Sequence, residues 1–396
     1  MSEWKEYRLG EVCIYNTERI PLNLLNEENY ISTENMLPNI GGVTISSNLP
    51  TSGNAVHFYN GDILISNIRP YFKKIWYANK EGGCSADVLC IRANKDIDKQ
   101  YLYYLLSQQD FFDYVMAGAK GCKMPRGDKQ HIMNWEISLP SLPTQQKIAS
   151  ILSSIDDKIE VNRRINEQLE ELAQALFKSW FVDFEPFKDG EFVESELGMI
   201  PKGWTTISLS KMADYLNGLA MQKFRPLQGE KGLPVLKIKE LGQDSCNETS
   251  ELCSPSLVNE KYIVNDGDVI FSWSGTLLVK IWCGGVCGLN QHLFKVTSEK
   301  YPKWFIYLWT KYHLDRFIRI AKDKAVTMGH IKRGELDTSF AIVPNEEKMK
   351  EIDRLMAPLI EQIIANNIEI RHLTALRATL LPKLMSGEID VNEVEI

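Results

Sequence analysis

The chain has 396 residues, enough for two or three domains. Hydrophobic residues make up 44% and charged residues 24%, which are ordinary globular values that exclude wholesale disorder and a collagen-like structure. The net charge of −7 excludes a uniformly basic coat for nucleic acid but is compatible with locally basic loops. No apolar run reaches the roughly 18 residues of a membrane helix, and the first residues form no secretory signal, so we expect a cytoplasmic protein.

The first part of the chain, residues 1–143, contains short β-branched and aromatic runs separated by Gly, Asn and Pro. Gly61–Ser66 and Asp87–Arg92 have the pattern of strands. One amphipathic helix is predicted at about Lys99–Tyr114. The sequence therefore predicts a small mixed domain with a β-sheet and helices.

Two loops of this domain are basic and also carry glycine or aromatic residues. Arginine and lysine side chains can contact phosphates or the guanine edge in the major groove, so the loops are candidates for contact with DNA. An ordinary solvated loop is the alternative for each residue. The candidates are Arg69, Tyr71, Lys73 and Lys74 in the first loop, and Lys120, Lys123, Arg126 and Lys129 in the second.

A single long helix is predicted next, within the segment 144–187. Its apolar residues alternate in steps of four and three, and the resulting mean period of 3.5 is typical of a coiled coil. The predicted seam consists of Ile148, Leu152, Ile155, Ile159, Asn162, Asn166, Leu169, Ala173 and Leu176.

Aromatic residues gather at the end of this helix. Part of the group must pack on the adjoining domain, and the remainder is available to dock a partner protein, since exposed aromatic patches are usually interfaces. The sequence does not decide between these two roles. The candidates for docking are Phe177, Trp180, Phe181 and Phe184.

The second half of the chain repeats the first. Three motifs recur in the same order, and the seam of the long helix recurs after them. Chance does not supply such a series, so the sequence predicts two tandem copies of a unit of about 200 residues. The matched motifs are Trp4-x-x-Tyr7-x-Leu9 with Trp204-x-x-Ile207-x-Leu209, Gly61–Ser66 with Gly267–Ser272, and Lys74-Ile75-Trp76 with Lys280-Ile281-Trp282.

The second copy is predicted to comprise a domain at 188–344, a long helix at 345–388 and a tail at 389–396. A short helix is expected at about Pro302–Ile320. The loops differ between the copies more than the helices do, which fits two units that read two different sequences. The candidate DNA contacts in this copy are Trp273, Lys280, Lys322, Lys324, Thr327, His330, Lys332 and Arg333.

The two long helices are predicted to pair antiparallel, because a long helix with one narrow apolar stripe needs a partner. Asn162 and Asn366 lie near the two helix midpoints, so we expect them to meet and fix the register; a solvated kink or a facing partner protein is the alternative. Pro358 should kink the second helix or mark its true start. The second seam consists of Ile352, Met356, Leu359, Ile363, Asn366, Ile370, Leu373, Arg377 and Leu380.

The sequence contains no plausible catalytic or cofactor-binding motif. Phosphate-binding glycine loops, the HExxH and CxxC patterns and the Asn-Pro-Pro-aromatic signature of amino-methyltransferases are missing. Cys283-x-x-x-Cys287 with His292 fits no common zinc site, and Glu346-Glu347-Lys348 is better explained by the preference for acidic residues at a helix start than as a nuclease motif. The eight cysteines are too few for a disulfide scaffold. We therefore expect a binding subunit without catalytic residues, metal or cofactor, and a self-contained methyltransferase or nuclease is disfavoured.

Several segments resemble the specificity subunits of type I restriction–modification enzymes. They occur in the order found in that family and cover both long helices and both domain entries, but not the middles of the recognition domains. The second helix lacks the glutamine present at Gln146, which is a local departure from the family pattern. The segments are Leu139–Ile148 with Ile155–Ile159 and Leu176–Phe181, then Leu197–Trp204, and finally Leu380–Ile389.

The resemblance implies an α+β fold with two target-recognition domains, each a small twisted sheet with helices, separated by a pseudo-two-fold pair of antiparallel coiled-coil helices. It implies a bipartite DNA site, one half-site per domain, with the spacer set by the helices. It also implies two methyltransferase (M) and two restriction (R) subunits as partners, to which S-adenosylmethionine, ATP and Mg belong. A protein–protein scaffold with coiled-coil arms and no direct DNA contact is the alternative.

Overall fold

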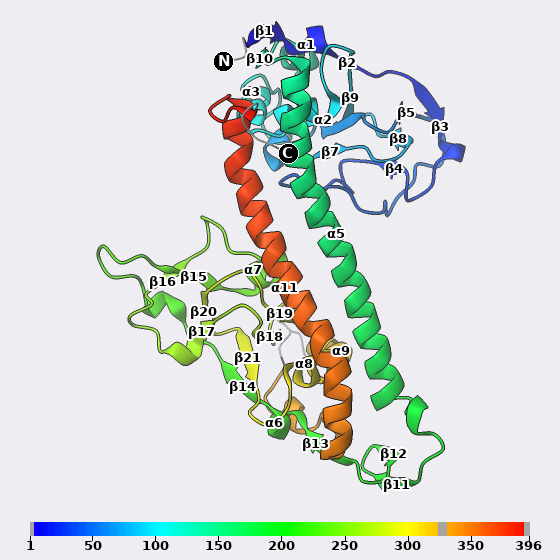
Figure 1. Cartoon of the computed structure of the whole chain (residues 1–396), viewed down its shortest axis with the longest axis vertical. Coiled ribbons are helices and arrows are strands. Elements are labelled where there is room, and N and C mark those ends of the chain that lie inside the picture. Colours follow the sequence, from blue (N-terminus) through cyan, green and yellow to red (C-terminus); the bar gives the residue numbers. More distant parts are fainter. Residues whose placement is uncertain (1–3, 324–330, 392–396) are drawn as a thin grey trace. The chain divides into compact units, whose positions relative to one another are not determined.

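The computed structural model describes residues 4–323 and 331–391, which form two compact units (Figure 1). Unit 1 comprises Met1–Asp157 and Thr374–Ile396, and unit 2 comprises Lys158–Leu373. There are two long helices, α5 (Leu142–Phe181) and α11 (Glu346–Met385). Each contributes one segment to unit 1 and another segment to unit 2.

Unit 1 contains three small sheets. Strands β1 (Lys5–Arg8) and β10 (Glu136–Leu139) form an antiparallel pair. An antiparallel sheet has the strand order β2-β9-β6-β7, with the bounds Cys13–Tyr15, Val88–Ala93, Ile63–Ser66 and Ile75–Tyr77. A third sheet has the order β3-β5-β8-β4, with the bounds Arg19–Pro21, Asn54–Phe58, Gly82–Cys84 and Tyr30–Ile31. The helices are α1 (Leu9–Val12), α2 (Lys99–Leu106), α3 (Gln109–Ala117) and α4 (Lys129–Met133), with short 3-10 turns η1 (Leu22–Leu24) and η2 (Pro70–Phe72).

Unit 2 contains the corresponding sheets and one extra hairpin, β11 (Phe192–Ser195) with β12 (Gly198–Pro201). Strands β13 (Thr205–Ser208) and β22 (Phe340–Val343) pair antiparallel. The sheet β14-β21-β18-β19 has the bounds Asp214–Asn217, Leu293–Thr297, Val269–Ser272 and Leu278–Ile281, and the sheet β16-β15-β20-β17 has the bounds Leu252–Cys253, Leu233–Leu236, Cys287–Leu289 and Ile263–Val264. The helices are α6 (Leu209–Met212), α7 (Ile238–Gln243), α8 (Lys303–Tyr312), α9 (Leu314–Asp323) and α10 (Gly334–Asp337), with 3-10 turns η3 (Glu185–Phe187), η4 (Met221–Lys223) and η5 (Glu260–Tyr262).

The predicted duplication of the fold is confirmed, and the copies diverge at one edge. The order β2-β9-β6-β7 recurs as β14-β21-β18-β19. Three strands of the other sheet also recur, with β4 parallel to β8 as β15 is to β20. The fourth strand differs, because β3 pairs with β5 whereas β16 pairs with β15, at the opposite edge of the sheet. The two copies therefore share a common frame, which consists of one complete four-stranded sheet and three strands of the other. They differ in the position of the fourth strand of that second sheet.

The repeated Gly-Asp motif forms the same turn in both copies. Gly61 has a φ of 92°, a conformation that glycine adopts readily. Asp62 then accepts the backbone N–H of Tyr59 at 2.8 Å and pairs with Arg92 on β9 at 2.8 Å. The motif is thus conserved between the copies because it ties a turn to the neighbouring strand. In unit 2 the corresponding residues are Gly267, Asp268, Asn265 and Lys295.

The sequence predicts one short helix in this part of each copy, but the structure has two consecutive helices there. The segment from Lys99 forms two helices, α2 and α3, because Gln108 adopts an extended conformation (φ −71°, ψ 157°) that ends the first helix. The segment from Pro302 likewise forms α8 and α9, with His313 as the C-cap of α8. The predicted strands are present as β6 and β9.

The long helices differ slightly from their predicted limits. Helix α5 begins at Leu142 and ends at Phe181, so residues 182–187 form a turn and η3 rather than helix. Helix α11 continues through Pro358, which therefore does not mark its start. Pro358 is exposed, and the carbonyl group that loses its helical partner there can be hydrated.

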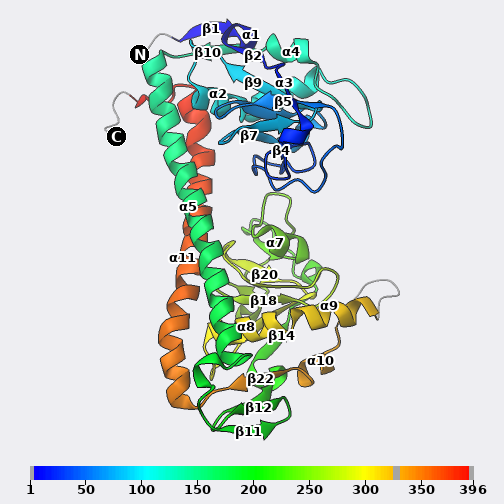
Figure 2. The same cartoon turned by 90° about the vertical axis from the view of Figure 1, so that its right-hand side faces the viewer.

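The two helices pair antiparallel in each unit (Figures 1 and 2). In unit 2 Asn162 contacts Glu369 while Asn166, one turn later, contacts Asn366. In unit 1 Arg377 forms an ion pair with Asp156. Every predicted seam position of both helices is buried or half-buried, which confirms the seam.

The predicted asparagine pair is wrong by one helical turn. Asn366 donates to Asn166 at 2.8 Å, and Asn162 donates to the Glu369 carboxylate at 2.7 Å. The packing of the apolar seam sets the register, and it offsets the helix midpoints by about one turn. The sequence counterpart of Asn166 in the second helix is Ile370, so the asparagine pair forms only once.

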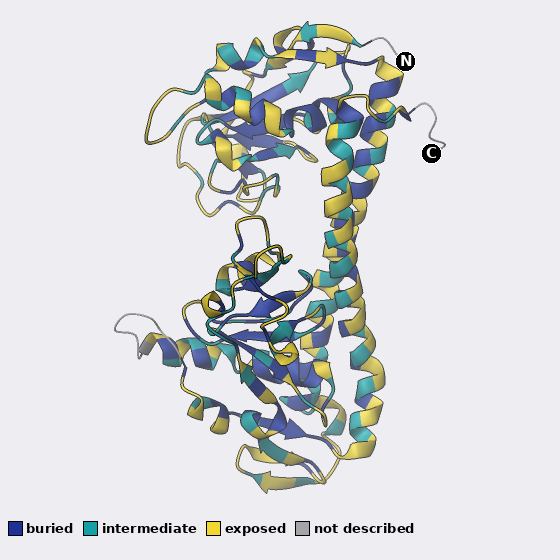
Figure 3. Cartoon of the chain, turned by 90° about the vertical axis from the view of Figure 1, so that its left-hand side faces the viewer, coloured by how far each residue is buried: buried dark blue, intermediate teal, exposed yellow. Residues whose placement is uncertain are grey.

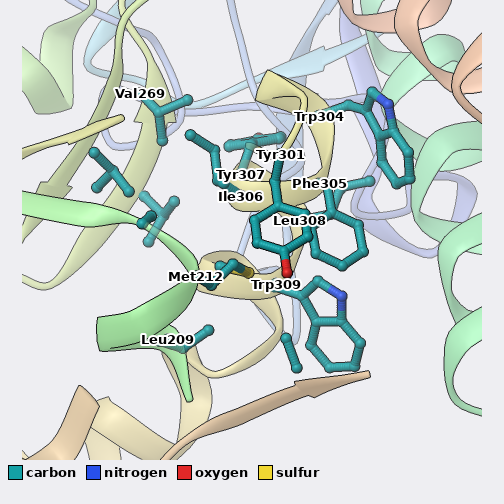
Figure 4. Packing of buried hydrophobic residues seen from close by; sticks show 14 of the residues in the cluster. Leu209, Met212, Val269, Tyr301, Trp304, Phe305, Ile306, Tyr307, Leu308 and Trp309 are labelled. Carbon is teal, nitrogen blue, oxygen red and sulfur yellow. The ribbon is translucent and has the colours of Figure 1, made fainter. Parts of the chain in front are cut away.

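Each unit closes its core with segments of both long helices. The core of unit 1 includes Ile148 and Leu152 of α5 and Leu384 and Met385 of α11. The core of unit 2 packs α8 and its neighbours against both helices (Figures 3 and 4). Among the described residues no helix combines the length and apolar character needed to cross a membrane.

The aromatic group at the end of α5 belongs largely to the core of unit 2. Phe177 and Phe181 are only 4% and 0% exposed, so their predicted role in partner docking is wrong. Their rings pack on aromatic residues of α8, which explains why the helix end is so rich in aromatic residues. Trp180 and Phe184 are half-buried against the same core.

Candidate nucleic-acid interface

The two basic loops of unit 1 meet in the structure. Ile68 and Arg126 form an isolated β-bridge, and the Arg69 N–H donates to the Pro125 carbonyl at 2.8 Å. The Gly127 N–H donates to the carbonyl of Asn67 at 3.2 Å. The segments 67–74 and 119–129, here called the unit 1 loop pair, therefore form one continuous surface from two distant parts of the sequence.

Three cations of the unit 1 loop pair, Lys120, Arg126 and Lys129, contact an acidic or aromatic side chain but remain exposed to solvent. Lys120 pairs with Asp128 at 2.5 Å, and together with two backbone N–H groups it lowers the pKa of that carboxyl to about 2. Arg126 pairs with Asp87 at 3.1 Å, and the Lys129 ammonium lies 5.7 Å from the centroid of the Tyr15 ring. Such exposed pairs are weak enough to exchange for a phosphate group.

Lys123 and Lys74 differ in accessibility. Lys123 is exposed at the tip of its loop. The Lys74 ammonium instead donates to the Thr33 carbonyl at 2.6 Å, and burial lowers its pKa. Lys123 is thus well placed for a phosphate, whereas Lys74 mainly holds the loop to its domain.

Backbone strain is concentrated beside this loop pair. Of the six non-glycine residues with positive φ in the described part of the chain, four lie here: Asn39, Ile40, Arg69 and Lys73. Their φ angles of 50–60° are costly for residues that carry a Cβ atom, most of all for a β-branched residue. Strained backbone of this kind gathers at functional sites. No pattern in the sequence predicts this strain, because none of the four residues is glycine.

Two buried polar atoms of the unit 1 loop pair lack a hydrogen-bond partner among the described residues. They are Oδ1 of Asn67 and Nε of Arg69. Buried polar groups are almost always paired, so such atoms point to a missing interaction. Asn67 was not among the predicted site residues. It lies three residues before the strained turn η2 in the sequence.

The corresponding loops of unit 2 also meet. The Ile331 N–H donates to the Trp273 carbonyl at 3.1 Å, and Arg333 donates to the Tyr215 carbonyl at 3.3 Å. The Trp273 indole donates to Asn217 at 2.9 Å, so this ring is held in a half-buried position. The segments 272–280 and 331–333 are here called the unit 2 loop pair.

The other candidates of unit 2 have different surroundings. Lys322 and Lys332 are exposed. Lys280 pairs with Asp244 at 2.6 Å and is only 29% exposed, so it is less accessible to an outside anion than Lys120 or Arg126. Lys324, Thr327 and His330 lie outside the described residues.

The described residues contain no cluster of three or more potential metal ligands. Cys287 is buried in β20, Cys283 is buried in the connection after β19, and His292 is in hydrogen-bond contact with Ser274. Glu346 lies in the first turn of α11 and pairs with Lys350, as expected for an acidic residue at a helix start.

Comparison with known proteins identifies similar sequences and folds. The family model for the type I restriction modification DNA specificity domain matches residues 1–171. The specificity subunit of the type I restriction enzyme MjaIX from Methanocaldococcus jannaschii is 33% identical, over 74% of this chain and 70% of its own length. The HindI specificity subunit from Haemophilus influenzae is 25% identical, over 98% of this chain and 100% of its own length.

A solved structure has a similar fold. The crystal structure of the type I restriction-modification S subunit from M. genitalium superposes with a TM-score of 0.58 at 15% identity, covering 97% of this chain and 96% of the other. At this identity the similarity bears on the fold alone.

The strain at Lys73 can be separated from its charge. We expect Lys73→Gly to be more stable to unfolding than Lys73→Ala by about 1 kcal/mol, because glycine tolerates the left-handed conformation and alanine does not. Both variants lose the same cation, so both should weaken binding to duplex DNA equally. Urea unfolding and salt titrations of DNA binding measure the two effects, and equal stabilities would show that the conformation carries no cost.

Proposed function

The chain belongs to the family of type I restriction–modification specificity subunits, and we propose that each of its units binds one half of a bipartite site in double-stranded DNA. The chain is the non-catalytic subunit of that system. The observation that carries the residue-level proposal is the meeting of two loops in each unit, both of them basic in unit 1.

In unit 1, the accessible cations position the loop pair on DNA. Lys120, Lys123, Arg126 and Lys129 contact backbone phosphates, and each neutralised phosphate releases condensed counterions. Arg69, which is half-buried beside them, adds a further cation to the same surface. In unit 2 the same roles fall to the exposed Lys322 and Lys332 and to Arg333, and Lys324, Thr327 and His330 remain sequence-based candidates.

The two units read different half-sites. The shared frame places a loop pair at the same position in each copy. The residues of the loop pairs differ, and so does the position of the fourth strand of one sheet. A common frame with different loops supports recognition of two unlike sequences.

The long helices set the spacing of the half-sites. Each helix has 40 residues and contributes to both units, and on this proposal helix length sets the spacing of the two half-sites. The asparagine pair and the apolar seam fix the register of the two helices. The spacing is therefore a property of the helix pair rather than of the loops.

The partners of the chain are the other subunits of the restriction–modification complex. We infer two M subunits, which bring S-adenosylmethionine, and two R subunits, which bring ATP and Mg. The half-exposed faces of Trp180 and Phe184 are the part of the aromatic group still available for contact with a partner.

Removing two loop cations tests the DNA contact. In the assembled complex, Lys123→Ser with Arg126→Ser should weaken DNA binding and reduce the slope of log K against log salt by roughly two, because two phosphate contacts are lost. The matched control is Lys5→Ser with Lys95→Ser, which removes two exposed lysines outside the loops. A protein–protein scaffold would respond alike to both double variants.

Lengthening the helices tests the spacing. Four residues inserted into both helices add roughly 6 Å and should lengthen the DNA spacer by one or two base pairs while both half-sites stay the same. Sequencing of methylated adenines in cells that carry the chain and its methyltransferase measures the site. Four residues inserted at the β11–β12 turn serve as the control and should change nothing. An unchanged spacer after the helix insertions contradicts the role of the helices.

A further inference from the structure

Two aromatic side chains on η2 are unusually exposed. Tyr71 and Phe72 are 48% and 38% exposed, and their ring centroids are 4.7 Å apart with the planes tilted by 55°. Burying an aromatic ring is favourable by a few kcal/mol, so leaving two adjacent rings in water forgoes that stabilisation. Neither ring belongs to the hydrophobic clusters formed by the described residues of unit 1.

The backbone that carries these rings is firmly held. The Phe72 carbonyl accepts the N–H of Asn39 at 2.8 Å, and the Lys73 carbonyl accepts the N–H of Ile40 at 2.9 Å. On the other side, Arg69 is bonded to Pro125 of the second loop. The strained turn is thus braced from both sides, so the backbone positions from which the two rings project are held before DNA binds.

The charge around the rings matches a polyanion. Arg69 and Lys73 flank them directly, and Arg126 forms a backbone bridge with the adjoining Ile68. The nearby carboxylates of Asp87 and Asp128 are already paired with Arg126 and Lys120. Cations around the two rings would not favour contact with an apolar protein surface. DNA is a better match, because its base faces can contact the rings while the phosphates of its two strands contact the surrounding cations.

We propose that Tyr71 and Phe72 stack on and partly separate bases of the DNA half-site bound by unit 1. The proposal rests on the DNA-binding function proposed above and assigns a specific contact to one loop. Aromatic and other apolar side chains that enter a base step unstack it and bend the duplex. The braced turn supplies the rigidity needed to push bases apart rather than yield to them.

Unit 2 lacks this feature. Its β18–β19 connection is two residues shorter than the β6–β7 connection, because Val269 pairs with Ile281 whereas Ile63 pairs with Tyr77, and its one aromatic residue, Trp273, is half-buried. No 3-10 turn like η2 forms among the described residues of this shorter connection between β18 and β19. Base separation by aromatic side chains of the specificity subunit should therefore occur in only one of the two half-sites.

The test uses the complete methyltransferase complex and a duplex that carries its mapped site. The fluorescent base 2-aminopurine is placed at successive positions in each half-site, and its emission rises when it is unstacked. We expect a rise on binding of the unmodified complex at a step in the unit 1 half-site away from the methylated adenine, because a methyltransferase flips its target base out of the duplex in either half-site. The double variant Tyr71→Ala with Phe72→Ala should abolish that rise and leave signals in the other half-site unchanged.

Affinity measurements separate stacking from charge. The double variant should bind roughly tenfold more weakly or worse, since a base–aromatic stack is worth about that much per ring. Its salt dependence should stay unchanged, because no cation is removed. The matched control is Tyr71→Phe with Phe72→Tyr, which keeps both rings and should retain the fluorescence rise.

The outcomes distinguish this proposal from the one on which it rests. Failure of the unmodified complex to bind the mapped site would contradict the proposed function itself. Normal binding with the same fluorescence rise in the double alanine variant would overturn the stacking role alone. Loss of assembly with the methyltransferase subunits in that variant would also overturn it, in favour of a protein contact.

Discussion

The antiparallel seam between α5 and α11 is the interaction on which the rest of the structure depends. The core of unit 2 takes Ala173, Phe177 and Phe181 from α5 and residues of α11, while the core of unit 1 takes residues from the opposite segments of both helices. Neither copy of the repeat closes its own core without the helix of the other. The duplication is therefore cooperative, since each long helix stabilises both domains and joins them.

This arrangement separates stability from recognition. The repeated sheets and the seam carry the apolar packing, and the loops carry the cations and the strain. A loop can change its residues without altering the frame, because loops contribute little to the buried core. In unit 1 the loop that carries η2 is strained and basic, and it exposes the rings of Tyr71 and Phe72. The loop after β18 in unit 2 carries the half-buried Trp273 instead. The two halves of a bipartite site would accordingly be read by different chemistry.

The sequence predicted the features that repeat or follow a period. The duplication, the two long helices and their seam are confirmed, because regular spacing of apolar residues reports directly on packing. The Asn162–Asn366 contact was wrong, since a period gives the face of a helix but not its register along the partner. The docking role of Phe177 and Phe181 was wrong because sequence alone does not distinguish exposed from buried aromatic residues. The strain at Asn39, Ile40, Arg69 and Lys73 could not be predicted, because tertiary hydrogen bonds impose it. The DNA contacts themselves stay predictions.

Disulfide trapping across the helix pair tests the seam most directly. In a background with the exposed Cys122 replaced by serine, Asn166→Cys with Asn366→Cys should cross-link within one chain under mild oxidation, because these side chains are in contact. The product contains a closed loop and migrates differently on a non-reducing gel. Asn162→Cys with Asn366→Cys, one turn out of register, should cross-link far more slowly. Faster cross-linking of the second pair, or only intermolecular products from the first, would contradict the paired helices described here.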